Sequence, residues 1–105
     1  MFNIGIDLGG TKIAAGLVDS RGNIVCKKSM PTRSGRDYKD IVSDMAGLVL
    51  DVAGQGGAET GQIESIGIGS PGAVDCNAGT IIYCSSLDFR DVPMRSELQK
   101  HINLP

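Results

Sequence analysis

The chain has 105 residues, of which 41% are hydrophobic, so it can bury one small core. It contains no apolar run near the roughly 18 residues that cross a bilayer, and we therefore expect no membrane segment. Ten basic and twelve acidic residues leave a net charge of −2, and the one basic pair is Lys27-Lys28, so we expect no nucleic-acid partner.

The amino terminus and the cysteines favour a cytoplasmic location. Residues 1–7 lack the basic flank, apolar stretch and cleavage site of a signal peptide. The three cysteines, Cys26, Cys76 and Cys84, include no C-x-x-C pair that could hold zinc or perform redox chemistry. We therefore expect them to be core or loop residues in a reducing compartment.

The first thirty residues predict three consecutive strands. Apolar and polar residues alternate over residues 2–8, and the pair Gly9-Gly10 ends the pattern. A second strand is predicted over residues 11–19, and a turn at 20–23 leads into a third strand over 24–30. Strands joined in this way form an antiparallel meander.

An amphipathic helix is predicted between residues 37 and 53, because apolar residues recur there at spacings of three, four and seven. The residues of this stripe are Ile41, Val42, Met45, Leu48, Val49 and Val52. The glycine-rich stretch 54–57 ends the helix. Residues 63–69 then read as a buried strand, which the right-handed crossover rule makes parallel to the first strand.

The remaining residues contain many turn formers. They surround a β-prone segment at 80–83, and Pro93 opens a short final helix with Met94, Leu98 and Ile102 on its inner face. We therefore predict an α/β fold with a mixed sheet, in which an antiparallel three-strand meander is joined by one parallel strand, and with two helices.

The stretch Asp7-Leu8-Gly9-Gly10-Thr11-Lys12 is the most informative about chemistry. Adjacent glycines allow positive φ angles and let backbone N–H groups approach a phosphate closely. Thr11 offers a hydroxyl, whereas Lys12 could simply face solvent. A carboxylate at the end of a strand beside a phosphate suits Mg²⁺, which makes Asp7 the candidate metal ligand. A tight hairpin turn alone would explain the two glycines, but not the flanking Asp and Thr.

The sequence does not fit two other phosphate-binding motifs. Gly67, Gly69 and Gly72 match the letters of the dinucleotide fingerprint, but residues 71–77 read as a turn leading into more β structure and not as a helix. No G-x-x-x-x-G-K-S/T occurs, so the loop is not of the Walker type. Phosphoryl transfer would then depend on a cleft between two lobes.

Two motifs together resemble the ROK family. One is Asp-x-Gly-Gly-Thr-Lys between two strands, and the other is Ile66-Gly67-Ile68-Gly69-Ser70-Pro71-Gly72-Ala73-Val74-Asp75. That family comprises bacterial glucokinases, related sugar kinases and sugar-responsive repressors. The resemblance implies an actin-like, ribonuclease H-like fold whose two lobes close over ATP and sugar. It also implies that residues 1–105 are the amino-terminal, phosphate-binding lobe and that the carboxyl-terminal lobe is absent.

The resemblance implies roles for nine residues. Those expected to bind ATP are Asp7, Gly9, Gly10, Thr11 and Lys12, with Asp7 acting through Mg²⁺. Those expected to line the sugar pocket are Gly72, Ala73, Ser85 and Ser86. Many relatives have Asn directly before the Leu of this hairpin, whereas this chain has Ser86 before Leu87, which leaves the identity of the sugar open.

The resemblance also implies what this segment lacks. Relatives carry their general-base aspartate shortly after the Leu-Pro that corresponds to Leu104-Pro105, so we expect this lobe alone to be inactive. Their zinc-binding cysteines and histidine lie in the second lobe, so zinc is expected only there and His101 is not a predicted ligand. An exposed face between lobes would favour a homo-oligomer.

The function implied is an ATP-dependent hexose kinase, with glucose as the first candidate substrate. The chain begins at the phosphate-binding strand with no helix-turn-helix in front of it, and this favours a kinase over the family's repressors. The alternatives are a sugar-sensing regulator or non-catalytic sugar-binding module, and an actin-like ATPase of another branch. The match over residues 69–75 argues against the last of these.

Overall fold

The computed structural model describes residues 1–69, 73–75, 79–84 and 89–102. The elements in chain order are β1 (Phe2–Leu8), β2 (Lys12–Val18), β3 (Ile24–Pro31), α1 (Tyr38–Gln55), the 3₁₀ helix η1 (Thr60–Gln62), β4 (Ile63–Gly69), β5 (Ala73–Asp75), β6 (Thr80–Cys84), β7 (Phe89–Val92) and α2 (Met94–Gln99). Within these described ranges, no helix is both long enough and apolar enough to span a membrane.

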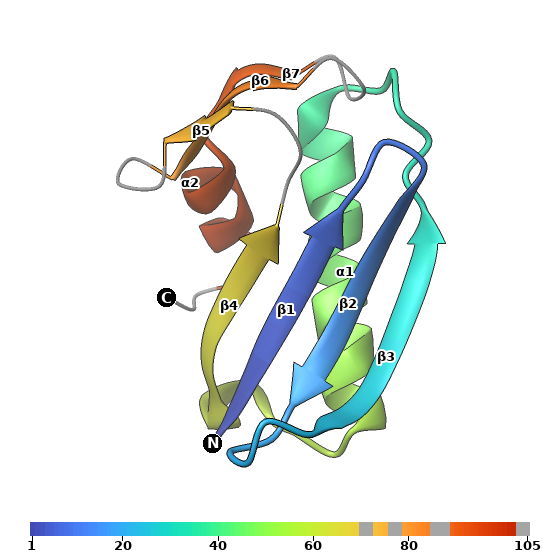
Figure 1. Ribbon diagram of the computed structural model, residues 1–105, viewed down its shortest axis with the longest axis vertical. Coiled ribbons are helices and arrows are strands. Elements are labelled where there is room, and N and C mark those ends of the chain that lie inside the picture. Colours follow the sequence, from blue (N-terminus) through green and yellow to red (C-terminus); the bar gives the residue numbers. More distant parts are fainter. Residues whose placement is uncertain (70–72, 76–78, 85–88, 103–105) are drawn as a thin grey trace.

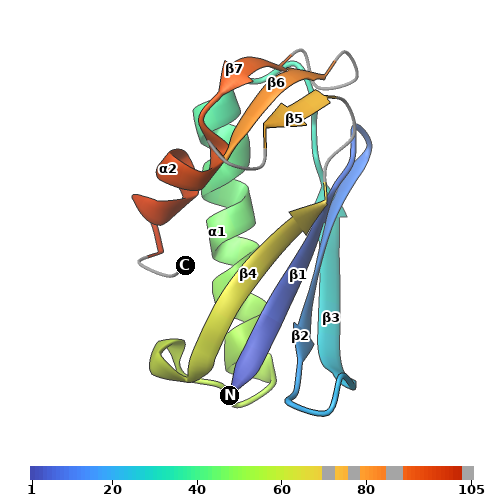
Figure 2. The same ribbon diagram turned by 60° about the vertical axis from the view of Figure 1, so that its left-hand side comes forward.

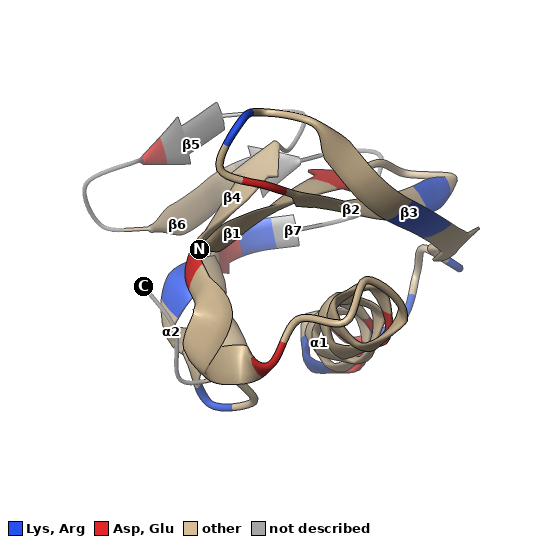
Figure 3. Ribbon diagram, turned by 90° about the horizontal axis from the view of Figure 1, so that it is seen from below, with Lys and Arg blue, Asp and Glu red and all other residues tan. Residues whose placement is uncertain are grey.

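A four-stranded sheet with the order β3-β2-β1-β4 forms the larger part of the fold (Figure 1). The pairs β1–β2 and β2–β3 are antiparallel, and β1 pairs with β4 in parallel. The predicted meander, the predicted parallel strand and the α/β class are therefore confirmed. Helix α1 packs on one face of this sheet, and no described element covers the other face (Figure 3).

The core lies between the sheet and α1. Alternate residues of β1 and β2 point toward the helix and are buried, and they are Ile4, Ile6, Leu8, Ile13, Ala15 and Leu17. All six residues of the predicted helical stripe are buried as well, together with Ala46 and Ala53. Because each buried Leu, Ile, Val or Met side chain contributes about 1.5–3 kcal/mol, this contact dominates the stability of the fold.

The ends of the helix and of the β2–β3 turn are made by local hydrogen bonds. Asp37 caps α1, since its Oδ1 accepts a hydrogen bond from the N–H of Lys39 at 2.9 Å. In the predicted turn, Asp19 Oδ1 accepts hydrogen bonds from the N–H groups of Arg21 and Asn23. The backbone hydrogen bond from Asn23 is the main cause that lowers the pKa of the half-buried Asp19.

A second sheet, with the order β5-β6-β7, lies beyond the carboxyl ends of β1 and β4 (Figure 1 and Figure 2). Helix α2 contacts α1 and β6, and the predicted inner residues Met94, Leu98 and Ile102 are buried. The sequence predicted β6 but not β5 or β7. These strands have three and four residues, which is too short for an alternating pattern to stand out among turn formers.

Two glycines, Gly56 at the C-cap of α1 and Gly47 in the middle of the helix, are expected to respond oppositely to alanine. A Cβ on Gly56 would collide with Leu17 Cδ2 and lie 3.3 Å from the carbonyl oxygen of Val52, so Gly56→Ala should destabilise the protein by about 1–3 kcal/mol. Gly47 lies on the exposed face of the helix with open space around it, so Gly47→Ala should stabilise by about 0.5–1 kcal/mol. Urea denaturation measures both changes. Equal shifts for the two variants would contradict this packing.

Candidate functional site

The parallel pairing of β1 and β4 brings the carboxyl ends of these two strands to one end of the main sheet (Figure 1). Asp7, near the end of β1, lies opposite Gly69, the last residue of β4. The start of the β1–β2 hairpin therefore lies beside Gly69. Residues 70–72 lie outside the described residues, and the chain is described again from Ala73, which begins β5.

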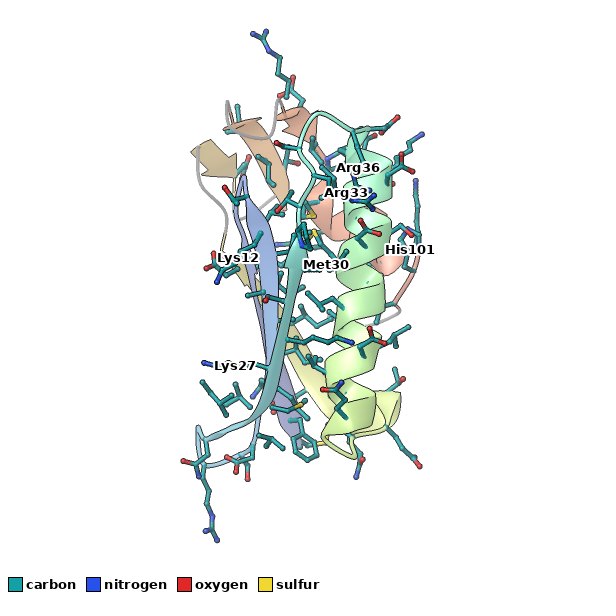
Figure 4. The ribbon with its side chains drawn as sticks, turned by 90° about the vertical axis from the view of Figure 1, so that its right-hand side faces the viewer. Lys12, Lys27, Met30, Arg33, Arg36 and His101 are labelled. Atoms are coloured by element: carbon teal, nitrogen blue, oxygen red, sulfur yellow. The ribbon has the colours of Figure 1, made fainter. Side chains whose placement is uncertain are left out.

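The charged side chains of the first motif lie on the uncovered face of the main sheet. Ile6 and Leu8 are buried against α1, so the exposed Asp7 between them points to the opposite face. Lys12 is exposed on the same face, and Figure 4 shows it pointing away from α1. No ion pair joins Asp7 and Lys12, two residues that are both described. Both charges are thus available to a ligand at this end of the sheet.

The hairpin is closed by a short backbone contact at Gly9. The Gly9 N–H donates a hydrogen bond to the Lys12 carbonyl oxygen at 3.0 Å, and a Cβ built on Gly9 would lie 3.0 Å from that same oxygen. Gly9 and Gly10 do not use the positive φ angles that glycine allows. The described glycines with positive φ are Gly22, Gly35, Gly57 and Gly79. Gly9 is needed for close approach and not for a left-handed conformation.

The hairpin leaves backbone donors free at its tip. Among the described residues, no carbonyl group accepts a hydrogen bond from the N–H of Gly10 or Thr11. Thr11 is exposed, so its side chain is also accessible. Successive unpaired N–H groups in a turn form a concave site suited to an anion, and a phosphate is such an anion.

One buried residue that the sequence analysis did not single out makes two hydrogen bonds to the backbone of the hairpin. Thr32, directly after β3, is fully buried. Its Oγ1 donates a hydrogen bond to the Gly9 carbonyl oxygen at 2.7 Å, and its N–H donates to the Thr11 carbonyl oxygen at 2.9 Å. Its own carbonyl oxygen accepts a hydrogen bond from Arg36 Nη2. No local pattern marks this residue, since Gly9 and Thr11, its partners in the hairpin, lie more than twenty positions earlier in the chain.

The family model described as ROK family matches residues 3–105. The chain belongs to the ROK family. It is 36% identical over 103 residues to a glucokinase of Streptomyces coelicolor and 32% identical to a putative xylose repressor of a Caldicellulosiruptor species. Each alignment covers 97% of this chain, but 30% of the first relative and 26% of the second. The chain therefore spans less than a third of the length of these relatives.

The ROK assignment extends to the fold. A crystal structure of a ROK family glucokinase from Streptomyces griseus, in complex with glucose and AMPPNP, superposes with a TM-score of 0.85 and 31% identity. It covers all of this chain, which corresponds to 31% of that structure. The predicted actin-like lobe is therefore confirmed.

Among the described residues of this ROK chain, a single carboxylate, that of Asp7, suits Mg²⁺ bound together with a nucleotide. No group of three or more His, Cys, Asp or Glu side chains in the described ranges could hold a metal ion. Mg²⁺ at phosphate sites is commonly held by one or two carboxylates, with phosphate oxygens and water completing its shell. Asp7 alone therefore suits an ion that arrives with a nucleotide, and not a site preformed by the protein.

The predicted sugar-binding residues are mostly beyond what the structure describes. Gly72, Ser85 and Ser86 lie outside the described residues, and Ala73 pairs with Tyr83 between β5 and β6. Their proximity to one another stays a prediction. His101 is exposed after the end of α2 and lies on the α1 side of the sheet, whereas Lys12 lies on the other side (Figure 4).

The close approach at Gly9 can be tested by an alanine substitution, with Gly5 on β1 as the matched control. Gly9→Ala should destabilise the protein by about 1–3 kcal/mol, because the new Cβ displaces the Lys12 carbonyl group. Gly5→Ala should stabilise by about 0.5–1 kcal/mol, because nothing lies within 4 Å of its Cβ position. Urea denaturation of the two variants tests the hairpin geometry, and a neutral Gly9→Ala would contradict it.

Proposed function

We propose that this chain is the phosphate-binding lobe of a two-lobed, ATP-dependent hexose kinase, with glucose as the first candidate substrate. The observation that carries the proposal is the hairpin, where the free N–H groups of Gly10 and Thr11 and the exposed Asp7 and Lys12 gather at one end of the sheet. The identity to a glucokinase solved with glucose and AMPPNP supports it.

Each hairpin residue has a proposed role toward ATP. The N–H groups of Gly10 and Thr11 bind phosphate oxygens, and Gly9 lets the turn close tightly enough to present them. Asp7 holds the Mg²⁺ that accompanies the nucleotide, an ion that neutralises charge developing on the transferred phosphoryl group. Lys12 adds a positive charge on the same face. The Thr11 hydroxyl can donate one further hydrogen bond.

The proposal assigns the rest of the reaction to other parts of the protein. Gly72, Ala73, Ser85 and Ser86 are proposed to line the sugar pocket beyond β4. A general base must lie within hydrogen-bond reach of the sugar hydroxyl, and we propose that it is an aspartate that follows Pro105 in the complete protein. Zinc, if the protein binds it, belongs to the second lobe. We therefore expect residues 1–105 alone to transfer no phosphate.

A second candidate is a sugar-sensing regulator. The identity of 32% to a putative xylose repressor over 97% of this chain favours it enough to be tested. A regulator would bind sugar at the same cleft but would need no phosphoryl transfer. Within the described residues the N–H groups of Gly10 and Thr11 have no acceptor and Asp7 makes no ion pair, which favours the kinase, because a sugar alone would not require an anion site next to a carboxylate.

An ADP-release assay on the complete protein distinguishes these two functions. Glucose, mannose, fructose, allose and N-acetylated hexosamines are each supplied with ATP and Mg²⁺, and residues 1–105 are assayed in parallel. We expect turnover with at least one sugar for the complete protein and none for the lobe. Saturable sugar binding without turnover would instead identify the regulator.

The same assay tests the role of Asp7. Asp7→Asn keeps the shape of the side chain but removes its charge, and we expect kcat/KM for ATP to fall by about 10²-fold or more. Asp51→Asn is the matched control, because Asp51 lies on α1, far from the hairpin, and pairs with the exposed Lys28 at 3.4 Å. Full activity of Asp7→Asn would remove the metal role from the proposal.

A further inference from the structure

We propose that Thr32 is a positioning residue that orients the peptide group between Gly9 and Gly10 for phosphate binding. The inference rests on the proposed function, since it takes the hairpin to be a phosphate site. Thr32 does not face the ligand itself. It lies beneath the hairpin, fully buried, and contacts the hairpin backbone on both sides of Gly10.

The geometry of a peptide group fixes the direction of the Gly10 N–H. In a planar trans peptide, the carbonyl oxygen and the N–H point in opposite directions. The Gly9 carbonyl and the Gly10 N–H belong to one peptide group. The hydroxyl of Thr32 holds this carbonyl oxygen at 2.7 Å, an ideal O–H···O distance. The Gly10 N–H is therefore directed away from Thr32, toward the side where a phosphate would bind.

This peptide group needs such a restraint more than most. It is flanked by two glycines, which lack the Cβ atoms that restrict backbone rotation in other residues. A rotation of the peptide by half a turn would direct the Gly9 carbonyl oxygen toward the phosphate and repel it. Thr32 opposes that rotation, because a flipped peptide would leave its hydroxyl buried without a partner.

A second hydrogen bond restrains the other side of the hairpin. The Thr32 N–H donates to the Thr11 carbonyl oxygen at 2.9 Å, which continues the β2–β3 ladder one step past the end of the strands. Thr32 thus binds the Gly9 carbonyl oxygen through its side chain and the Thr11 carbonyl oxygen through its backbone N–H. Replacement of the side chain removes the first contact and leaves the second.

Thr32 is itself held by α1. Arg36 Nη2 donates to the Thr32 carbonyl oxygen at 2.6 Å and to Asp44 Oδ2 at 2.8 Å, and Arg36 Nε donates to the Arg33 carbonyl oxygen at 3.0 Å. Arg33 adopts a φ of 52°, which is uncommon for a residue with a Cβ. The Arg36 and Asp44 side chains are about three-quarters buried, so solvent weakens their charge-assisted contact only in part. The position of the loop is therefore tied to the helix that packs on the sheet.

The test is Thr32→Val in the complete protein, which removes the hydroxyl but keeps the shape of the side chain. We expect kcat/KM for ATP and the affinity for AMPPNP with Mg²⁺ to fall about 5- to 30-fold, the effect of one or two hydrogen bonds. The KM for the sugar should stay unchanged. Thr32→Ser restores a hydroxyl and should recover most of the loss.

Ser65→Ala is the matched control, because the Ser65 hydroxyl also bonds to β1, at Asn3 Oδ1 and 2.8 Å, near the opposite end of the strand. It should leave all ATP parameters unchanged. If Thr32→Val does not fold, Arg36→Lys carries the test, since it keeps the hydroxyl but loses the fork that joins Thr32 to Asp44. Arg36→Lys should weaken ATP binding but not sugar binding, and by a smaller factor than Thr32→Val does.

The outcomes separate this inference from the proposed function. A parent protein that neither turns over nor binds AMPPNP overturns both. A parent that binds AMPPNP, with Thr32→Val binding equally well, overturns the positioning role alone. A Thr32→Val variant that weakens sugar and ATP equally would show a general structural role and would also overturn it.

Discussion

The packing of α1 against β1 and β2 is the contact on which the arrangement of the main sheet depends. The chain leaves β3, crosses the sheet face through the helix and returns as β4, and a right-handed crossover of this kind places the new strand parallel to β1. The carboxyl ends of β1 and β4 then coincide. The hairpin residues Asp7, Thr11 and Lys12 lie at this end of the sheet and, being exposed, take no part in the core.

The division between core and site also explains the chemistry of the hairpin. On β1, the residues that face α1 are apolar and buried, and those that face away include Asn3, Gly5 and Asp7. The carboxylate therefore reaches the surface without a cost in burial. On the buried side of the turn, Thr32 donates hydrogen bonds to the carbonyl oxygens of Gly9 and Thr11. The N–H groups of Gly10 and Thr11 are left as donors at the exposed tip.

The sequence predicted the features that a local pattern encodes. The stripe from Ile41 to Val52 and the alternation in β1 both depend on spacing alone, and the parallel strand followed from a rule of connection. The roles of Thr32 and Gly9 depend on contacts across the chain, where no local pattern records them. The paired glycines allow positive φ but do not adopt it, and Gly9 meets a different requirement, the lack of a Cβ beside the Lys12 carbonyl group. The site beyond β4 stays a prediction for Gly72, Ser85 and Ser86, which the structure does not describe.

The central claim, that the tip of the hairpin binds nucleotide phosphates, is most directly tested by nuclear magnetic resonance. The complete protein, labelled with ¹⁵N, is titrated with AMPPNP in the presence of Mg²⁺, and the amide signals are followed residue by residue. The account predicts that the N–H signals of Gly10 and Thr11 shift in a saturable manner, and further than the N–H signals of the residues of β1 and β2. Saturable nucleotide binding that leaves these two signals unchanged would contradict it.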